Sequence, residues 1–136
     1  MKKAIVCVDD ESIILNSLGE QIENMFGSDL IYEYAENAEE GMDVLEELMA
    51  EGIKVMVIVS DWLMPGKKGD EFLIEVHKKF PNIIKVLLTG QADETAIENA
   101  KQNANLFACI HKPWTAEQLE TVIKSGISDN EKQGDE

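Results

Sequence analysis

The chain has 136 residues and a formal net charge of −15, from 27 acidic residues against 12 basic residues, all of them lysines. This length suits one domain with a single hydrophobic core. The acidic balance argues against direct binding to nucleic acid or to an anionic membrane surface, because both need clustered basic side chains. A metal ion or a basic partner fits the charge better.

In chain order, apolar runs alternate with segments of helical spacing. The runs predict strands over 4–8, 30–35, 55–59, 83–88 and 107–110, and the spacing predicts helices over 13–26, 38–50, 69–80, 93–104 and 115–125. Ser12 or Asp10 is the candidate cap of the first helix and Thr115 of the last. Continuous apolar strands that alternate with helices indicate an α/β fold with a doubly wound parallel sheet.

The ends of the chain and its cysteines complete this outline. Residues 1–126 are predicted to form the domain, and residues 127–136 a loose polar tail that suits the start of a linker. Cys7 and Cys109 lie in separate apolar runs, which predicts buried, reduced thiols. Because there is no signal peptide and no run of membrane-spanning length, we expect a cytoplasmic protein.

Polar side chains follow four of the predicted strands. They are Asp9 and Asp10 after the first, Asp61 after the third, Thr89 after the fourth and Lys112 after the fifth. Because parallel strands end at one edge of the sheet, we expect these side chains to converge there. Clustered carboxylates are hard oxygen ligands that suit Mg²⁺, and an aspartate can also attack phosphorus to form an acyl phosphate. The pattern therefore indicates a magnesium-dependent phosphoryl-transfer site.

Four short motifs carry a family resemblance. "VDDE" (8–11), "SDWLMPGKKG" (60–69), "LLTG" (87–90) and "HKPW" (111–114) stand in this order at the ends of the predicted strands. Together they resemble the receiver domain of two-component response regulators, the family that includes the chemotaxis regulator. The resemblance spans nearly the whole chain. It implies a flavodoxin-like, five-stranded parallel sheet in the order 2-1-3-4-5 with five helices.

The resemblance also implies a role for individual residues. Asp61 would be the phosphoacceptor, and Asp9, Asp10 and Asp61 would bind Mg²⁺ together with the backbone carbonyl of Leu63. Thr89 would be the switch hydroxyl. Lys112 would pair with the phosphoryl group and precede a cis proline.

The implied partners are proteins. A sensor histidine kinase or a phosphotransfer protein would donate the phosphoryl group, and a downstream protein or a fused output domain would respond to it. The chain would then catalyse only its own phosphorylation and dephosphorylation. The oligomeric state is open.

Several alternatives remain at this point. The family usually has an aromatic residue where this chain has Cys109, which suggests a pseudo-receiver that acts as an unphosphorylated interaction module. "LTGQAD" with "KPW" is similar to receivers that regulate a C-terminal signalling enzyme. A small magnesium-dependent phosphohydrolase would use Asp61 as its nucleophile, but its usual second aspartate is replaced by Leu63.

Overall fold

The computed structural model describes residues 2–90 and 94–134, in which strands and helices alternate. The strands are β1 (Lys3–Val8), β2 (Ile31–Ala35), β3 (Lys54–Asp61), β4 (Ile84–Thr89) and β5 (Ala108–His111). The helices are α1 (Ser12–Phe26), α2 (Ala38–Ala50), α3 (Gly69–Lys79), α4 (Glu94–Asn103) and α5 (Ala116–Gly134), with a 3₁₀ turn at Gly27–Asp29. The last three residues of "LTGQAD", 91–93, lie outside the described residues.

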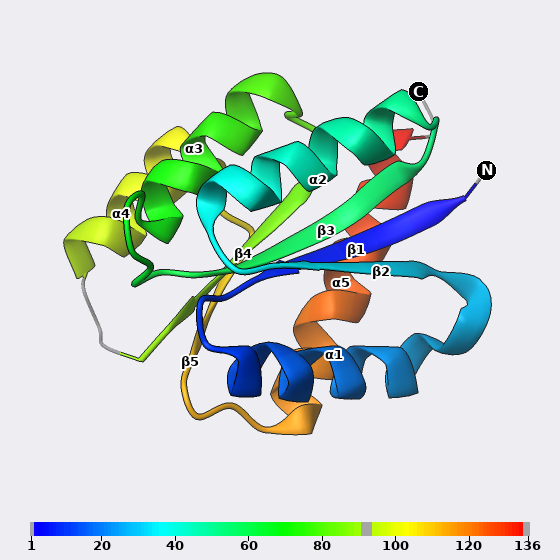
Figure 1. The fold of residues 1–136 in the computed structure, drawn as a ribbon, viewed down its shortest axis with the longest axis horizontal. Helices are drawn as coiled ribbons and strands as arrows, with labels where there is room; N and C mark the ends of the chain where they lie inside the picture. The colour runs from blue at the N-terminus through cyan, green and yellow to red at the C-terminus, as the bar shows by residue number, and fades with distance from the viewer. Residues whose placement is uncertain (1, 91–93, 135–136) are drawn as a thin grey trace.

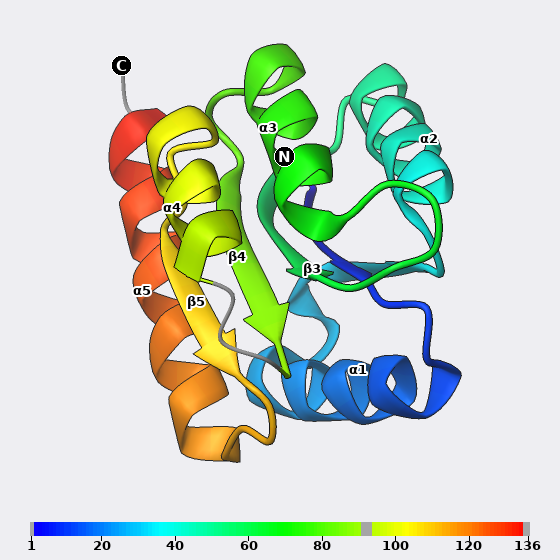
Figure 2. The same ribbon diagram turned by 90° about the vertical axis from the view of Figure 1, so that its left-hand side faces the viewer.

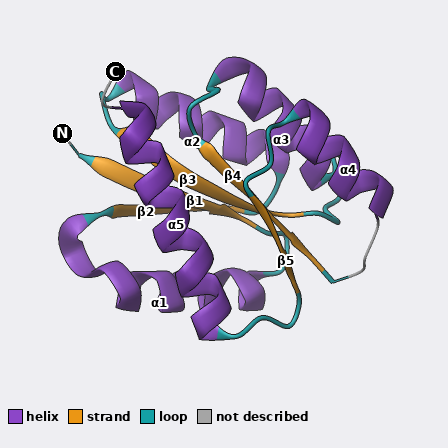
Figure 3. Ribbon diagram, turned by 180° about the vertical axis from the view of Figure 1, so that it is seen from behind, coloured by secondary structure: helices purple, strands orange, loops and turns teal. Residues whose placement is uncertain are grey.

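The five strands form one parallel sheet in the order β2-β1-β3-β4-β5. Helices α1 and α5 cover one face of this sheet, and α2, α3 and α4 cover the other (Figures 1 and 3). The predicted flavodoxin-like fold and strand order are confirmed. None of the described helices combines the length and the apolar character that crossing a membrane requires.

The central strands are apolar on both sides because each side faces a layer of helices. Along β1, Val6 and Val8 belong to the core beneath α2, α3 and α4, whereas Ile5 and Cys7 belong to the core beneath α1 and α5. All four side chains are at most 1% exposed. This two-sided burial explains the continuous apolar runs from which the strands were predicted. The thiol of Cys7 is buried as expected, but Cys109 is only half-buried; both are free.

The C-terminal helix corrects one expectation. Helix α5 continues to Gly134, so the prediction of a loose tail from residue 127 is wrong for residues 127–134. Asn130 explains the difference: its Nδ2 donates hydrogen bonds to the carbonyl oxygens of Met56 (3.1 Å) and Asn82 (2.8 Å). The extension is therefore attached to β3 and to the turn before β4.

The predicted caps had different outcomes. Thr115 caps α5 as expected, because its Oγ1 accepts a hydrogen bond from the backbone N–H of Gln118 (3.1 Å) and the Gln118 side chain bonds back to Thr115 N (2.9 Å). Neither Ser12 nor Asp10 caps α1, whose N-cap residue is Glu11 with no side-chain cap bond. The role given to Ser12 or Asp10 was therefore wrong.

Candidate functional site

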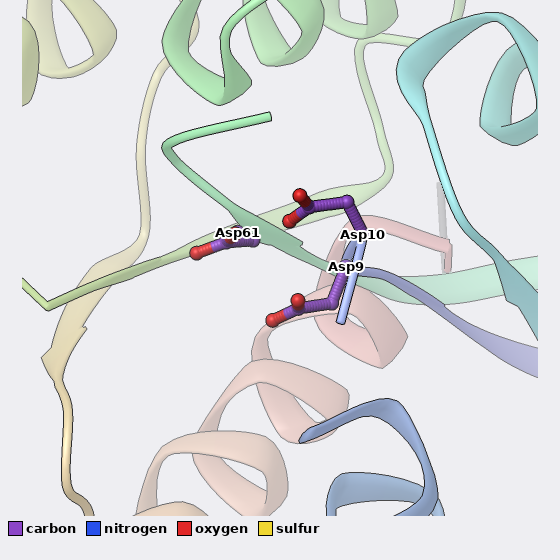
Figure 4. A group of neighbouring side chains, drawn as sticks. All are labelled: Asp9, Asp10 and Asp61. Carbon is purple, nitrogen blue, oxygen red and sulfur yellow. The ribbon is translucent and has the colours of Figure 1, made fainter. Parts of the chain in front are cut away.

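The strand register brings the predicted acidic residues together. Val8 of β1 pairs with Ser60 of β3, so Asp9 and Asp61 follow side by side at the carboxyl ends of two neighbouring central strands. Oxygen atoms of Asp9, Asp10 and Asp61 all lie within 4.8 Å of one another (Figure 4). Strand β1 lies between β2 and β3, so the order of strands reverses at β1. The cluster lies at this switch point, where open α/β sheets bind ligands.

The three carboxylates differ in their surroundings. Asp9 is 0% exposed and Asp61 is 4% exposed, whereas Asp10 is exposed. One oxygen of Asp9 accepts a hydrogen bond from the backbone N–H of Glu11 (2.9 Å), which fixes this side chain against the start of α1. The site thus has two buried carboxylates beneath a third that faces solvent.

Lys112 supplies the positive charge of the site. Its Nζ lies 2.8 Å from Oδ1 of Asp61 and 3.2 Å from Oδ2 of Asp9, so it bridges the two buried carboxylates. The backbone N–H of Lys112 donates to the carbonyl oxygen of Thr89 (2.8 Å), and the Lys112–Pro113 peptide bond is cis as expected. These contacts hold the lysine over the ends of β1 and β3.

Burial and charge move two pKa values at the site. Burial raises the pKa of Asp61 to about 6, helped by the neighbouring charge of Asp9 and opposed by the hydrogen bond to Lys112. Burial acts to lower the pKa of Lys112, but its hydrogen bond to Asp61 and the charges of Asp61 and Asp9 outweigh that effect and raise it. One ammonium group, on Lys112, lies beside three carboxyl groups. Their negative charge exceeds its positive charge when they are ionised, so the site can bind a further cation.

The remaining predicted residues lie around this cluster. Thr89 is 2% exposed and ends β4 directly opposite His111. The side chain of Leu63 is 56% exposed beside the site. The use of the Leu63 carbonyl as a metal ligand stays a prediction.

The loop after Asp61 has a glycine that no other residue could replace without a shift of the backbone. The N–H of Gly69 donates to the carbonyl oxygen of Trp62 (2.7 Å), which closes the loop onto the start of α3. A Cβ atom at Gly69 would lie 2.1 Å from the carbonyl oxygen of Asp61. The glycine in "GKKG" thus allows helix α3 to begin directly against the site.

Besides Asn130, sequence reasoning missed the buried polar residues Asp70 and Lys85. Asp70, in the first turn of α3, is 7% exposed and accepts a hydrogen bond from Trp62 Nε1 (3.1 Å). Its position three residues before the buried Leu73 was a signal, because helical spacing places both on one face. Lys85 is 1% exposed near the start of β4, as its place between Ile84 and Val86 in an apolar run indicated.

Comparisons with known proteins agree with the fold and the cluster. A family model for the response regulator receiver domain matches residues 5–124. The hydrogenase transcriptional regulatory protein HoxA of Cupriavidus necator is 33% identical over 81 residues, which are 60% of this chain and 17% of HoxA. The sensor kinase CckA of Brucella abortus is 33% identical over 85 residues, 62% of this chain and 9% of CckA. The chain thus matches a small part of each curated relative.

Solved structures give the same result. A CheY-like response regulator receiver domain protein from Methanospirillum hungatei has a TM-score of 0.84 and 28% identity, and the match covers 98% of this chain and 99% of that one. The signal receiver domain of an HD domain-containing protein from Pseudomonas fluorescens has a TM-score of 0.86 at 20% identity, over 98% and 93% of the two chains, and shows the shared fold alone. By its family match, its strand order and its acidic cluster, the chain belongs to the response regulator receiver domains of two-component signalling.

Proposed function

We propose that Asp61 accepts a phosphoryl group and that the resulting charge switches a protein-binding surface. The observation that carries this proposal is the contact of a buried Asp61 carboxylate with Lys112 at 2.8 Å, within a cluster that also holds Asp9 and Asp10. A carboxylate held in this way has one oxygen positioned by an ammonium group and further acidic oxygens beside it. This arrangement suits a nucleophile in phosphoryl transfer.

In the proposed reaction, an oxygen of the Asp61 carboxylate attacks phosphorus and forms an acyl phosphate. The bond between phosphorus and the donor atom breaks, and the leaving group keeps the electron pair. Lys112 is placed to bond a phosphoryl oxygen, and the Thr89 hydroxyl would bond another after a rotation of its side chain. Hydrolysis reverses the modification when water attacks the same phosphorus.

The donor set fits Mg²⁺. Asp9, Asp10 and Asp61 offer hard carboxylate oxygens within 4.8 Å of one another, and the Leu63 carbonyl would add a fourth protein ligand. The ion would supply positive charge next to the phosphoryl oxygens. The same charge would favour the ionised form of Asp61, which is the form that attacks.

The proposed partners follow from this chemistry. The donor is a phosphohistidine of a sensor histidine kinase or of a phosphotransfer protein, and the recipient of the signal is a downstream protein or a fused output domain. The named relatives include one sensor kinase and one transcriptional regulatory protein, both much longer than the matched segment. The two free cysteines fit the reducing conditions of the cytoplasm, where we place this reaction.

Intact-mass measurement tests the proposal. The purified chain is incubated with acetyl phosphate, with and without MgCl₂. We expect one added phosphoryl group that depends on magnesium, is absent in Asp61→Asn and is retained in Glu11→Gln. Glu11 is the matched control, because it is an exposed acid directly after the cluster.

The outcome separates the rival functions. If the chain without substitutions gains no phosphoryl mass, this result would contradict the proposal and favour a pseudo-receiver. Continued release of phosphate from simple phosphate esters at multiple turnovers would indicate a phosphohydrolase instead. A phosphorylated Asp61→Asn chain would place the modification on another residue.

A further inference from the structure

Trp62, the residue after the proposed phosphoacceptor, is held by three hydrogen bonds. Its N–H donates to the carbonyl oxygen of Leu88 in β4 (2.8 Å), and its carbonyl oxygen accepts from the N–H of Gly69 (2.7 Å). Its indole Nε1 donates to Oδ1 of Asp70 (3.1 Å). The side chain is 8% exposed. A displacement of the backbone after Asp61 must therefore move the indole relative to Asp70.

Asp70 joins this tryptophan to a different helix. Its second oxygen, Oδ2, accepts a hydrogen bond from Nδ2 of Asn99 in α4 (3.1 Å). Among the described residues, no lysine forms an ion pair with Asp70, and its side-chain hydrogen-bond donors are these two neutral groups. A carboxylate that is 7% exposed is costly to leave without its donors, so each donor constrains the position of the other.

Among the described residues, helix α4 places few large apolar side chains in the core. It packs beside α3 (Figure 2), and its buried side chains are the small Ala96 and Ala100, with Ile97 half-buried against the same core. Apolar burial scales with area, so these side chains stabilise the docking of the helix less than several buried leucines would. The hydrogen bond from Asn99 to Asp70 therefore adds a polar attachment between α4 and α3, and helices held by few buried contacts move more easily.

We propose that Asp70 is the positioning residue that couples phosphorylation of Asp61 to α4, through the chain Trp62–Asp70–Asn99. This inference rests on the proposed function. The acyl phosphate adds negative charge and bulk to the last residue of β3, which displaces Trp62 and changes the geometry of the carboxylate that it shares with Asn99. The populations of α4 conformations then shift, because the loop after Asp61 holds α4 with different strength in the phosphorylated and the unphosphorylated chain.

Hydrogen–deuterium exchange of residues 94–103 tests this coupling, combined with intact mass on the same samples. Asn99→Ala removes the contact on α4, and Trp62→Phe keeps a ring in the core but removes the indole N–H. Gln102→Ala is the matched control, because it loses an exposed hydrogen bond to Glu98 on the same helix (2.9 Å). Each variant is compared with and without acetyl phosphate in MgCl₂.

In the chain without substitutions, we expect phosphorylation to change the rate of hydrogen–deuterium exchange in α4 by about fivefold. Asn99→Ala and Trp62→Phe should reach the same phosphorylated fraction by mass but lose most of that change, and Gln102→Ala should keep it. A purely structural role would alter exchange equally in both states of a variant and leave the difference intact. Two results would overturn the coupling. One is a full change in α4 exchange in phosphorylated Asn99→Ala or Trp62→Phe. The other is no change in α4 exchange when the chain without substitutions is phosphorylated. Absence of phosphorylation would overturn the proposed function, and the coupling with it. If either variant fails to fold, Asp70→Asn replaces it.

Discussion

A fully buried lysine and a partly buried lysine lie at opposite ends of the strands, and their pKa values move in opposite directions: Lys85 is 1% exposed, and the Lys112 side chain is 17% exposed. Lys112, at the carboxyl edge, bonds to Asp61 and Asp9, and these partners raise its pKa although burial acts to lower it. Lys85, near the amino edge, donates to the backbone carbonyl oxygens of Pro81 and Ile83, and it forms no ion pair within the part of the chain that the structure describes. Burial lowers the pKa of Lys85 to about 8. Burial alone therefore does not decide whether a lysine stays charged.

The difference shows how function and structure divide between the two edges. At the carboxyl edge, acids outnumber the lysine, so the site retains negative charge that a metal ion can neutralise. At the amino edge, the carbonyl oxygens do not neutralise Lys85, and burial instead shifts this side chain toward its uncharged form. The site is the place where negative charge exceeds its positive partners, so the two ends of the strands should respond differently to substitution, pH and magnesium.

Removal of the lysine at the carboxyl edge should have the largest effect. Lys112→Met leaves two buried carboxylates without their cation, and we expect a loss of about 3 kcal/mol in the free energy of unfolding at pH 8 in EDTA. Urea denaturation measures this loss. The double variant with Asp61→Asn should recover most of it, because one buried charge is then absent. An equal loss in the single and double variants would attribute the effect to packing instead.

Removal of one acid should stabilise the metal-free protein. In the folded state Asp61 has a pKa of about 6 against an ordinary value of 3.8, so the folded state binds more protons between these values and stability falls as the pH rises through them. Above pH 6 the cost is fully present. Asp61→Asn should therefore raise the free energy of unfolding by about 2 kcal/mol at pH 8 and clearly less at pH 5. A gain that does not change with pH would show that Asp61 is not perturbed.

Bound Mg²⁺ should offset part of the destabilisation that the clustered carboxylates cause. At about ten times its dissociation constant, Mg²⁺ is expected to add about 1.4 kcal/mol to the free energy of unfolding. The gain should disappear in Asp9→Asn and persist in Glu11→Gln, as followed by thermal denaturation at pH 8. Equal stabilisation of Asp9→Asn would place the bound ion elsewhere on this acidic chain.

The amino edge should show the smallest effect and the opposite sign. Lys85 releases its proton near pH 8 in the folded state but at the ordinary value of 10.5 when unfolded, so the folded chain gains stability as the pH rises from 8 toward 10.5. Relative to Lys85→Met, the chain without substitutions should gain about 1 kcal/mol between pH 8 and pH 9. A constant difference over this range would mean that the lysine keeps its proton.

The sequence predicted the fold and the site through the same signal. Continuous apolar runs located the strands, and Asp9, Asp61 and Lys112 were found because each stands within two residues of the end of such a run. Asp70 was overlooked because it lies inside a helix, where a polar residue is ordinarily exposed, and its burial depends on donors from Trp62 and α4. Such contacts between distant segments follow from packing and are not visible in local periodicity.

The end of α5 was misjudged for a related reason. Residues 127–134 are polar in composition, which suggested a tail, yet Leu119, Ile123 and Asn130 keep the helical spacing of a buried face. A polar side chain can occupy a buried position when carbonyl oxygens accept its protons, and Asn130 does so. The polar composition of this segment hid the inward positions of Ile127 and Asn130.

That asparagine also determines where the domain can be cut for expression. A fragment trimmed to the limits of the family match, residues 5–124, would lack Asn130 and leave the carbonyl oxygens of Met56 and Asn82 without its N–H donors. It would also uncover Val57 and Ile84, which lie close to Gly126 on the same helix. The shortest chain that keeps the core closed therefore extends beyond the region of shared sequence.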